Sequence, residues 1–306
     1  MASRLPPLGA GSGAETSMLE IKRIVCPVDF SEFSATAFEY AHSLARHYNA
    51  KLFIQHVAEP FISISPRYVS QPVIDQVYAQ QVADAEEKIR EMTKRRSLND
   101  VEHEVILERG AAADSILELA AAERMDLIAM GTHGKRGLDR LVLGSVTERV
   151  LRKAPCPVLV VPRPAQEAAK AAAEPGEFHQ ILYCTDFNED SPRALEYALL
   201  LACRYKAGLS LLHVVEGSNE KKLEPEKQAA LQQLQAAIPL QTCGPVEPAV
   251  RAGKPYEQIL AHAAETGADL IALGVRGRSA VNLALFGSTT HRVIQLGSRP
   301  VLVVRT

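Results

Sequence analysis

The chain has 306 residues and a formal net charge of −2, from 34 basic and 36 acidic residues. A balance this even argues against nucleic acid or an anionic membrane as the main partner, because both require excess positive charge. Five cysteines without a Cys-x-x-Cys pair predict no metal site, and we interpret all five as packing residues in a reducing compartment. The length suits two domains of ordinary size.

Residues 1–18 combine prolines and glycines with no apolar run of signal-peptide length. We therefore predict a disordered tail and a cytoplasmic location. Apolar strands then alternate with amphipathic helices, and the strands carry apolar residues on both faces. This pattern is typical of a parallel sheet covered on both sides, so it predicts a doubly wound α/β domain. The predicted strands span 21–28, 51–57, 101–108, 125–130 and 157–161.

A glycine loop follows the fourth predicted strand and precedes a helix at 146–153. This order creates an anion site, because unpaired N–H groups at a helix start carry partial positive charge and glycines let a phosphate approach. Two roles stay open for the histidine in the loop, a phosphate donor or a solvated residue. The candidate residues are Gly131, Thr132, His133, Gly134, Gly144, Ser145, Val146 and Thr147.

Residues 163–178 are rich in Ala, Glu and Pro, and we interpret them as a linker between domains at 19–162 and 179–306. Beyond the linker the series restarts: eight of the thirteen residues in 29–41 recur at an offset of 157. The glycine loop recurs as well, with the same internal spacing. Its candidate residues are Gly274, Val275, Arg276, Gly277, Gly287, Ser288, Thr289 and Thr290.

The repeated spacing Gly-x2-Gly-x9-Gly-Ser resembles the nucleotide-binding signature of the universal stress protein family, tandem two-domain type. The resemblance implies two five-stranded, Rossmann-like domains that bind ATP, AMP or ADP, with Mg²⁺ accompanying ATP. It also implies contacts to adenine from the backbone of Val57 and Val214, and contacts to ribose or adenine from Asp29 and Asp186. Both aspartates have an alternative role, which is to cap the following helix.

Two classes of function stay open. The favoured one is a stress-response module whose nucleotide state controls binding or regulation. The alternative is an enzyme of the same fold that hydrolyses ATP slowly or transfers adenylate. The repeated motif supplies no evident general base, so we assign no catalytic residue. His56 and His213 are interpreted as core or strand-end residues and not as catalysts.

Fourteen extra residues lie in the first half, within or near 60–81, where they form either a lid or a longer helix. The final strands, 157–161 and 300–304, are almost wholly apolar, and an exposed apolar edge favours pairing with another edge. In the family that the motif resembles, domains join through these strands. We therefore expect an internal pseudo-dimer, with a homodimer as a further assembly.

Overall fold

The computed structural model describes residues 20–59, 70–96, 98–134, 143–162, 175–188, 191–216, 220–275 and 287–305. The predicted tail, most of the predicted linker and the middle of each glycine loop lie outside the described residues.

The first half contains the predicted strands and helices in the predicted order. The strands are β1 (Arg23–Pro27), β2 (Lys51–Ala58), β3 (His103–Arg109), β4 (Leu127–Gly131) and β5 (Val158–Val161). The helices are α1 (Glu32–Tyr48), α2 (Gln71–Arg96), α3 (Ala112–Ala122) and α4 (Ser145–Lys153), with a short 3-10 turn at Leu98–Asp100.

The second half repeats this order. Its strands are β6 (Gln180–Thr185), β7 (Gly208–Val215), β8 (Val246–Ala252), β9 (Leu270–Val275) and β10 (Val301–Arg305). Its helices are α5 (Ser191–Tyr205), α6 (Glu220–Ala237), α7 (Pro255–Glu265) and α8 (Ser288–Leu296). The helix at the insertion, α2, has 26 residues where α6 has 18, so a longer helix accounts for part of the extra length. The stretch before it, 60–69, lies outside the described part of the chain.

Local signals explain where the first helix begins and ends. Ser31 is the N-cap of α1, and its hydroxyl accepts a hydrogen bond from Ser34 N at 3.2 Å. Asn49 follows the last turn in the left-handed region, with φ 53°, where Asn is tolerated better than most residues.

The ten strands of the described residues form one sheet in the order β3-β2-β1-β4-β5-β10-β9-β6-β7-β8. Strands pair in parallel within each half, while β5 and β10 pair antiparallel, with Leu159 opposite Leu302. The expected joining of the two halves through their last strands is therefore confirmed. The pairing covers two apolar edges that would otherwise invite association.

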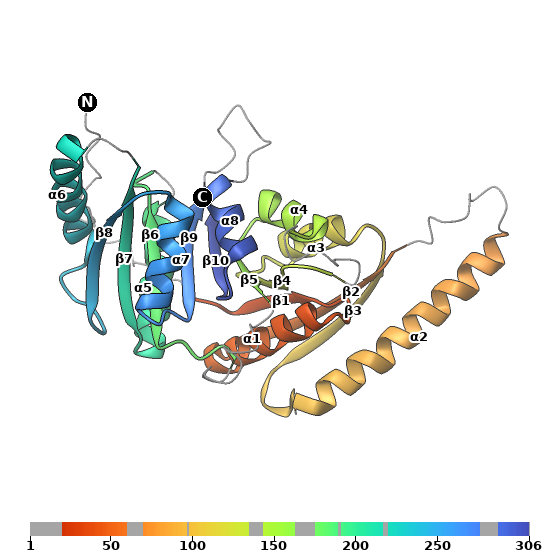
Figure 1. The fold of residues 1–306 in the computed structure, drawn as a ribbon. Helices are drawn as coiled ribbons and strands as arrows, with labels where there is room; N and C mark the ends of the chain where they lie inside the picture. The colour runs from red at the N-terminus through yellow and green to blue at the C-terminus, as the bar shows by residue number, and fades with distance from the viewer. Residues whose placement is uncertain are drawn as a thin grey trace.

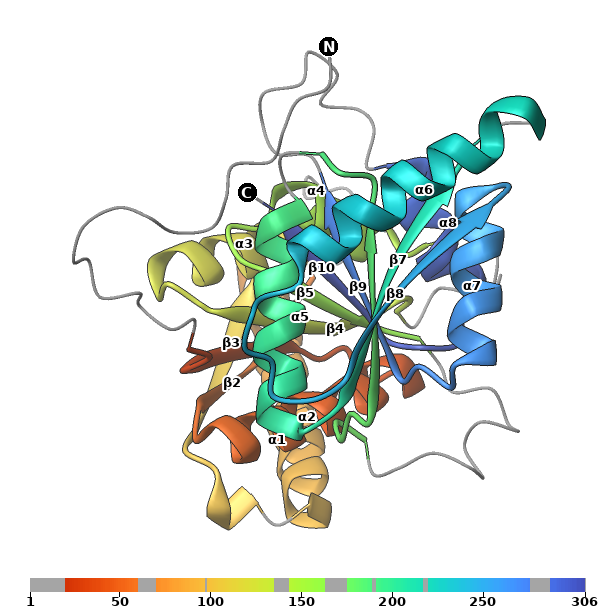
Figure 2. The same ribbon diagram turned by 90° about the vertical axis from the view of Figure 1, so that its left-hand side faces the viewer.

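Helices cover both faces of this sheet (Figure 1 and Figure 2). Residues of α1, α2, α5 and α6 pack into one apolar core, and residues of α3, α4, α7 and α8 pack into another on the opposite face. Each core contains residues from both halves, so burial is continuous across the β5–β10 joint. No helix among the described residues is long and apolar enough to cross a membrane.

An aromatic cluster links the ends of α1 and α5. The rings of His47 and Tyr205 stack with centroids 4.0 Å apart, and Tyr48 and Phe178 meet Tyr205 edge-on. Arg204 places its guanidinium over the Tyr48 ring. These contacts supplement the strand pairing, because they join equivalent helix ends of the two halves.

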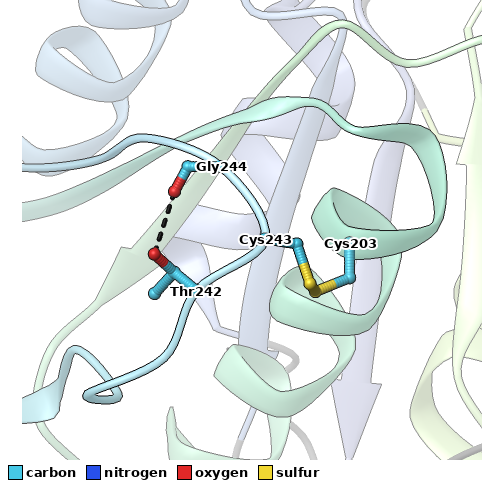
Figure 3. Close-up of a disulfide and its surroundings, with 4 residues drawn as sticks. All are labelled: Cys203, Thr242, Cys243 and Gly244. Atoms are coloured by element: carbon cyan, nitrogen blue, oxygen red, sulfur yellow. Dashed lines mark hydrogen bonds between the residues drawn. A yellow bond between two sulfur atoms is a disulfide. The ribbon is translucent and has the colours of Figure 1, made fainter.

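Two of the five cysteines are not simple packing residues, which corrects the prediction. Cys203, in the last turn of α5, forms a disulfide with Cys243 in the segment before β8, with Cα atoms 4.9 Å apart (Figure 3). Their separation of 40 residues gives no sequence signal, because the connectivity of cysteines cannot be deduced from spacing alone. The inference of a reducing compartment therefore loses its basis in the cysteines.

The other three cysteines, Cys26, Cys156 and Cys184, are buried free thiols, as predicted. Burial raises the pKa of Cys156 to about 12 and also raises the pKa of Cys26 and Cys184. These thiols are therefore unreactive packing groups.

The joint between the halves can be tested with Val303→Asp. Val303 is 1% exposed and lies opposite Val158, so a carboxylate there would be buried without a partner and should lower the free energy of unfolding by about 3 kcal/mol or more. Urea unfolding should show both halves unfolding together. The control is Val105→Asp, on the edge strand β3, where the valine is 43% exposed. Loss confined to the second half would contradict the joint.

The disulfide can be tested with the Cys203→Ser/Cys243→Ser variant. Removing a cross-link that closes a loop of this length should destabilise the protein by about 4 kcal/mol on the chain-entropy estimate. Thermal unfolding with and without dithiothreitol measures the effect. The reductant should lower the melting temperature of the wild type and leave that of the variant unchanged. Equal responses of the two proteins would contradict the cross-link.

Candidate functional site

A cavity of about 770 Å³ opens at the carboxyl ends of β1, β2 and β4. This is the edge of a parallel sheet where ligands bind, because the strand order reverses between β1 and β4. All its lining residues belong to the first half. They include every first-copy candidate except Thr132, namely Asp29, Val57, Gly131, His133, Gly134, Gly144, Ser145, Val146 and Thr147.

The start of α4 supplies backbone donors to this cavity. Gly144 is the N-cap and has no side chain to accept from the first turn. The N–H groups of Ser145, Val146 and Thr147 have no acceptor within a helix that begins here, because each would need a carbonyl four residues earlier. Partial positive charge therefore faces the cavity at these residues.

Two hydrogen bonds hold this helix start against β4. Gly144 N donates to Thr132 O at 2.9 Å, and the Thr147 hydroxyl donates to Gly131 O at 2.9 Å. Thr132 is 3% exposed and is not among the residues that line the cavity, so its part is to hold the start of α4 beside the end of β4.

His133 is held in place from both sides. Its Nδ1 lies 3.0 Å from the Thr132 hydroxyl, and its ring lies against Phe33 with centroids 5.0 Å apart. Its Nε2 is closed to solvent and has no hydrogen-bond partner among the described residues. His133 as a whole is half-buried and lines the cavity, so both of its roles remain predictions.

Packing leaves no room for a side chain at Gly131, the last residue of β4, and little room at Gly134 beyond the strand. A Cβ on Gly131 would lie 2.8 Å from Phe33 Cβ, and a Cβ on Gly134 would lie 2.6 Å from Asp29 Oδ2. The glycine pattern predicts room for a phosphate but does not reveal this packing constraint. At these positions the glycines first allow the loop to lie against α1 and Asp29.

Asp29 fixes the turn that precedes α1, but the N-cap of that helix is Ser31, so the capping alternative for Asp29 is wrong. Its Oδ1 accepts from Ser31 N at 3.0 Å and from the Ser31 hydroxyl at 2.6 Å, which fixes the turn before α1. The same carboxylate lines the cavity. Asp186 makes a similar turn, accepting from Asn188 N at 3.2 Å and from the Ser191 hydroxyl at 3.3 Å.

The second copy repeats the frame in its described part. Gly274 and Val275 end β9, Val214 lies near the end of β7, and Gly287 caps α8 without a side-chain hydrogen bond. Ser288, Thr289 and Thr290 form its first turn, and Thr290 is buried. Arg276 and Gly277 lie outside the described residues.

The paired histidines are strand-end residues, as predicted. His56 Nδ1 donates to Val28 O at 2.7 Å, and His213 Nδ1 donates to Thr185 O at 2.8 Å. Each bond joins a second strand to the end of the first strand beside it.

One face of α2, which no sequence motif indicates, completes the cavity. Gln81, Asp84 and Lys88 line the cavity at helical spacing, and the Lys88 ammonium lies 5.5 Å from the centroid of the Phe30 ring. Asp29, Glu59 and Asp84 outnumber this lysine along the wall. An anionic group therefore depends chiefly on backbone donors, or on a cation that accompanies it. No group of three or more His, Cys, Asp or Glu placed to hold a metal occurs in the described part of the chain.

A buried serine–histidine pair in the second half does not form a nucleophile and base. His262 Nε2 lies 2.9 Å from the Ser210 hydroxyl, and Arg251 Nε donates to His262 Nδ1 at 3.1 Å. Because Nδ1 accepts, the proton of the neutral ring is on Nε2, which donates to Ser210. Burial, with Arg251 adding to it, lowers the pKa of His262. The ring therefore cannot take the serine proton through Nε2.

Comparison with protein families gives two matches along the chain. The model of the universal stress protein family matches residues 20–162 and 177–305. A universal stress protein of Methanocaldococcus jannaschii is 37% identical over 148 residues, which cover 48% of this chain and 85% of that protein. One from Thermus aquaticus is 34% identical over 141 residues, covering 46% of this chain and 98% of that protein.

Solved structures show the same arrangement over nearly the whole chain. A universal stress protein from Archaeoglobus fulgidus has a TM-score of 0.71 at 25% identity, covering 92% of this chain and 98% of that one. A protein from Pseudomonas aeruginosa, described as a putative universal stress protein, has a TM-score of 0.63 at 18% identity, with 94% of each chain covered. The match to the Pseudomonas aeruginosa protein shows only that the two chains share a fold.

The role of Asp29 in the turn before α1 can be tested by two substitutions. Asp29→Ala removes the acceptor for Ser31 N and the Ser31 hydroxyl and should lower the free energy of unfolding by about 1 kcal/mol. Asp29→Asn keeps an oxygen acceptor and should stay close to the wild type. Urea unfolding measures both. Equal stability of the alanine and asparagine variants would contradict this role in the turn.

Proposed function

The chain belongs to the universal stress protein family, and on that premise we propose that its first domain binds an adenine nucleotide, ATP, AMP or ADP. The protein then acts in a stress response as a module whose nucleotide state controls binding or regulation. The observation that carries the proposal is the uncapped start of α4, which directs backbone donors into a cavity of about 770 Å³. This volume lies within the usual range for small-molecule sites.

We propose that different parts of the cavity hold different parts of the nucleotide. The phosphates bind at Gly144–Thr147, where N–H donors and hydroxyls converge. Ribose is placed beside Asp29, whose carboxylate accepts hydrogen bonds, and adenine beside the backbone of Val57. Mg²⁺ would accompany the phosphates when ATP is bound, because it needs only one or two protein carboxylates besides the phosphates, and Asp29, Glu59 and Asp84 lie along the wall.

The second domain is proposed to use the equivalent positions. These are Asp186, Val214, Gly274, Val275, Arg276, Gly277, Gly287, Ser288, Thr289 and Thr290. Its affinity is expected to differ, because the residues between the glycines differ from those of the first copy. We propose that the two domains span residues 19–162 and 179–306, with a linker at 163–178.

Binding ranks above catalysis in this proposal. A slow ATPase or adenylate transferase of the same fold would need a group that orients the attacking nucleophile, and we assign none. The protein is proposed to act as an internal pseudo-dimer, with a homodimer as a further assembly. We also propose a cytoplasmic location, where the Cys203–Cys243 disulfide would face reducing conditions.

The phosphate position can be tested with Ser145→Glu. An acidic residue in the first turn favours the helix dipole, so the fold should be kept while phosphate is repelled. Loss of one or two charge-assisted hydrogen bonds, at roughly 1.5–3 kcal/mol each, should weaken ATP binding by at least about tenfold in calorimetry.

Two matched variants serve as controls for this measurement. Ser145→Ala removes only the hydroxyl and should have a smaller effect, because the backbone donors remain. Ser288→Glu makes the same change in the second domain and reports whether that site contributes. ATP affinity unchanged in Ser145→Glu, with the fold intact, would refute the phosphate position.

A further inference from the structure

A buried amide lies in the wall of the first cavity. Gln55, near the end of β2, is 0% exposed and is among the lining residues. Side chains alternate along a strand, so Gln55 is on the same face as Phe53 and opposite to Ile54. Ile116 of α3 and Met130 of β4 belong to the apolar core on that face, and both line the cavity as well. A polar group here requires partners, because burying one without hydrogen bonds is unfavourable.

Glu108 supplies one partner and thereby fixes the orientation of the amide. Gln55 Nε2 donates to Glu108 Oε2 at 2.8 Å. A carboxylate oxygen accepts hydrogen bonds, so turning the amide over would set oxygen against oxygen. The Gln55 Oε1 is left as an acceptor that is closed to solvent and has no partner among the described residues. A donor on a bound molecule would satisfy it.

The second domain shows that the fold does not need this pair. Leu212 occupies the position equivalent to Gln55 and is also 0% exposed. Arg251 occupies the position equivalent to Glu108, and it bonds to His262 and Glu265. An apolar residue therefore fills the same place in the same sheet. The polar pair belongs to the first domain alone and requires a reason other than strand packing.

The sheet order indicates which part of a ligand would meet Gln55. β1 lies between β4 and β2, so β2 is two strand spacings, roughly 10 Å, from the strand that leads into the phosphate position (Figure 1). A nucleotide with its phosphates at α4 would therefore place its base towards β2. Val57, the proposed neighbour of adenine, lies two residues beyond Gln55 on the same strand.

We propose that Gln55 is a specificity-determining residue, whose Oε1 accepts a hydrogen bond from the exocyclic amine of adenine. This inference rests on the proposed function. A base with a carbonyl oxygen in place of the amine would bring two acceptors together and bind less well. Because Oε1 is closed to solvent in the described conformation, the side chain shifts towards the base when the nucleotide binds, as side chains at binding sites commonly do. Glu108 is the positioning residue.

The test compares ATP with inosine triphosphate, which carries a carbonyl where ATP carries the amine. Calorimetry is done on the full chain with Ser288→Glu, so that the first domain dominates. We expect ATP to bind at least about tenfold more tightly than inosine triphosphate. In Gln55→Leu, which introduces the residue of the second domain, ATP should weaken by about tenfold and inosine triphosphate should change by less than about twofold.

Two further variants separate recognition from general destabilisation. Glu108→Gln can pair with either orientation of the Gln55 amide, because it can accept from Nε2 or donate to Oε1, so the preference for ATP should shrink while binding persists. Phe53→Leu changes a buried residue on the same face that does not line the cavity, so it should affect the melting temperature and leave the preference unchanged.

The outcomes distinguish the two proposals. If Gln55→Leu weakens both nucleotides equally, or weakens neither, the assignment of Gln55 is wrong while nucleotide binding stands. If the parent protein binds neither nucleotide, the proposed function fails and this inference fails with it.

Discussion

The antiparallel pairing of β5 with β10 is the constraint on which the rest of the structure depends. Val158–Val161 and Val301–Val304 are apolar and almost fully buried, so neither strand is suited to stand at an exposed edge. Their pairing extends both cores across the joint. It also reverses strand direction between the halves, so the carboxyl ends of the two sets of strands lie at opposite edges. Two sites built on those ends cannot share one ligand.

The sequence predicts the frame well, because the frame depends on repeated local patterns. Apolar runs followed by helical periodicity define nine strands and helices per half, and the apolar character of 157–161 and 300–304 points to the joint. The position of the cavity follows from the same logic, since parallel strands bring their carboxyl ends to one edge. Residues distant in the chain, such as Asp29 and Gly144, therefore meet there as expected.

The remaining features depend on distances that no local pattern encodes. Cys203 and Cys243 meet only because α5 ends beside the segment that enters β8. Gly131 lacks a side chain because Phe33 packs against it, a contact between segments almost a hundred residues apart. Gln55 looks like any polar residue in a strand until β3 places Glu108 beside it. The cavity face of α2 follows an insertion that lacks a counterpart in the second half.

Duplication explains how such differences can accumulate in one fold. The same place in the sheet accommodates Gln55 with Glu108 in one half and Leu212 with Arg251 in the other, and the hydrogen bonds of Glu108 and Arg251 stay within their own halves. The first arrangement leaves the Gln55 Oε1 without a partner among the described residues. In the second arrangement, Arg251 bonds to His262 and Glu265. Burial in the sheet therefore limits both halves in the same way, whereas the polar groups near the ends of β2 and β7 are free to differ. Because each half closes these hydrogen bonds within itself, the fold allows the two halves to differ in ligand preference.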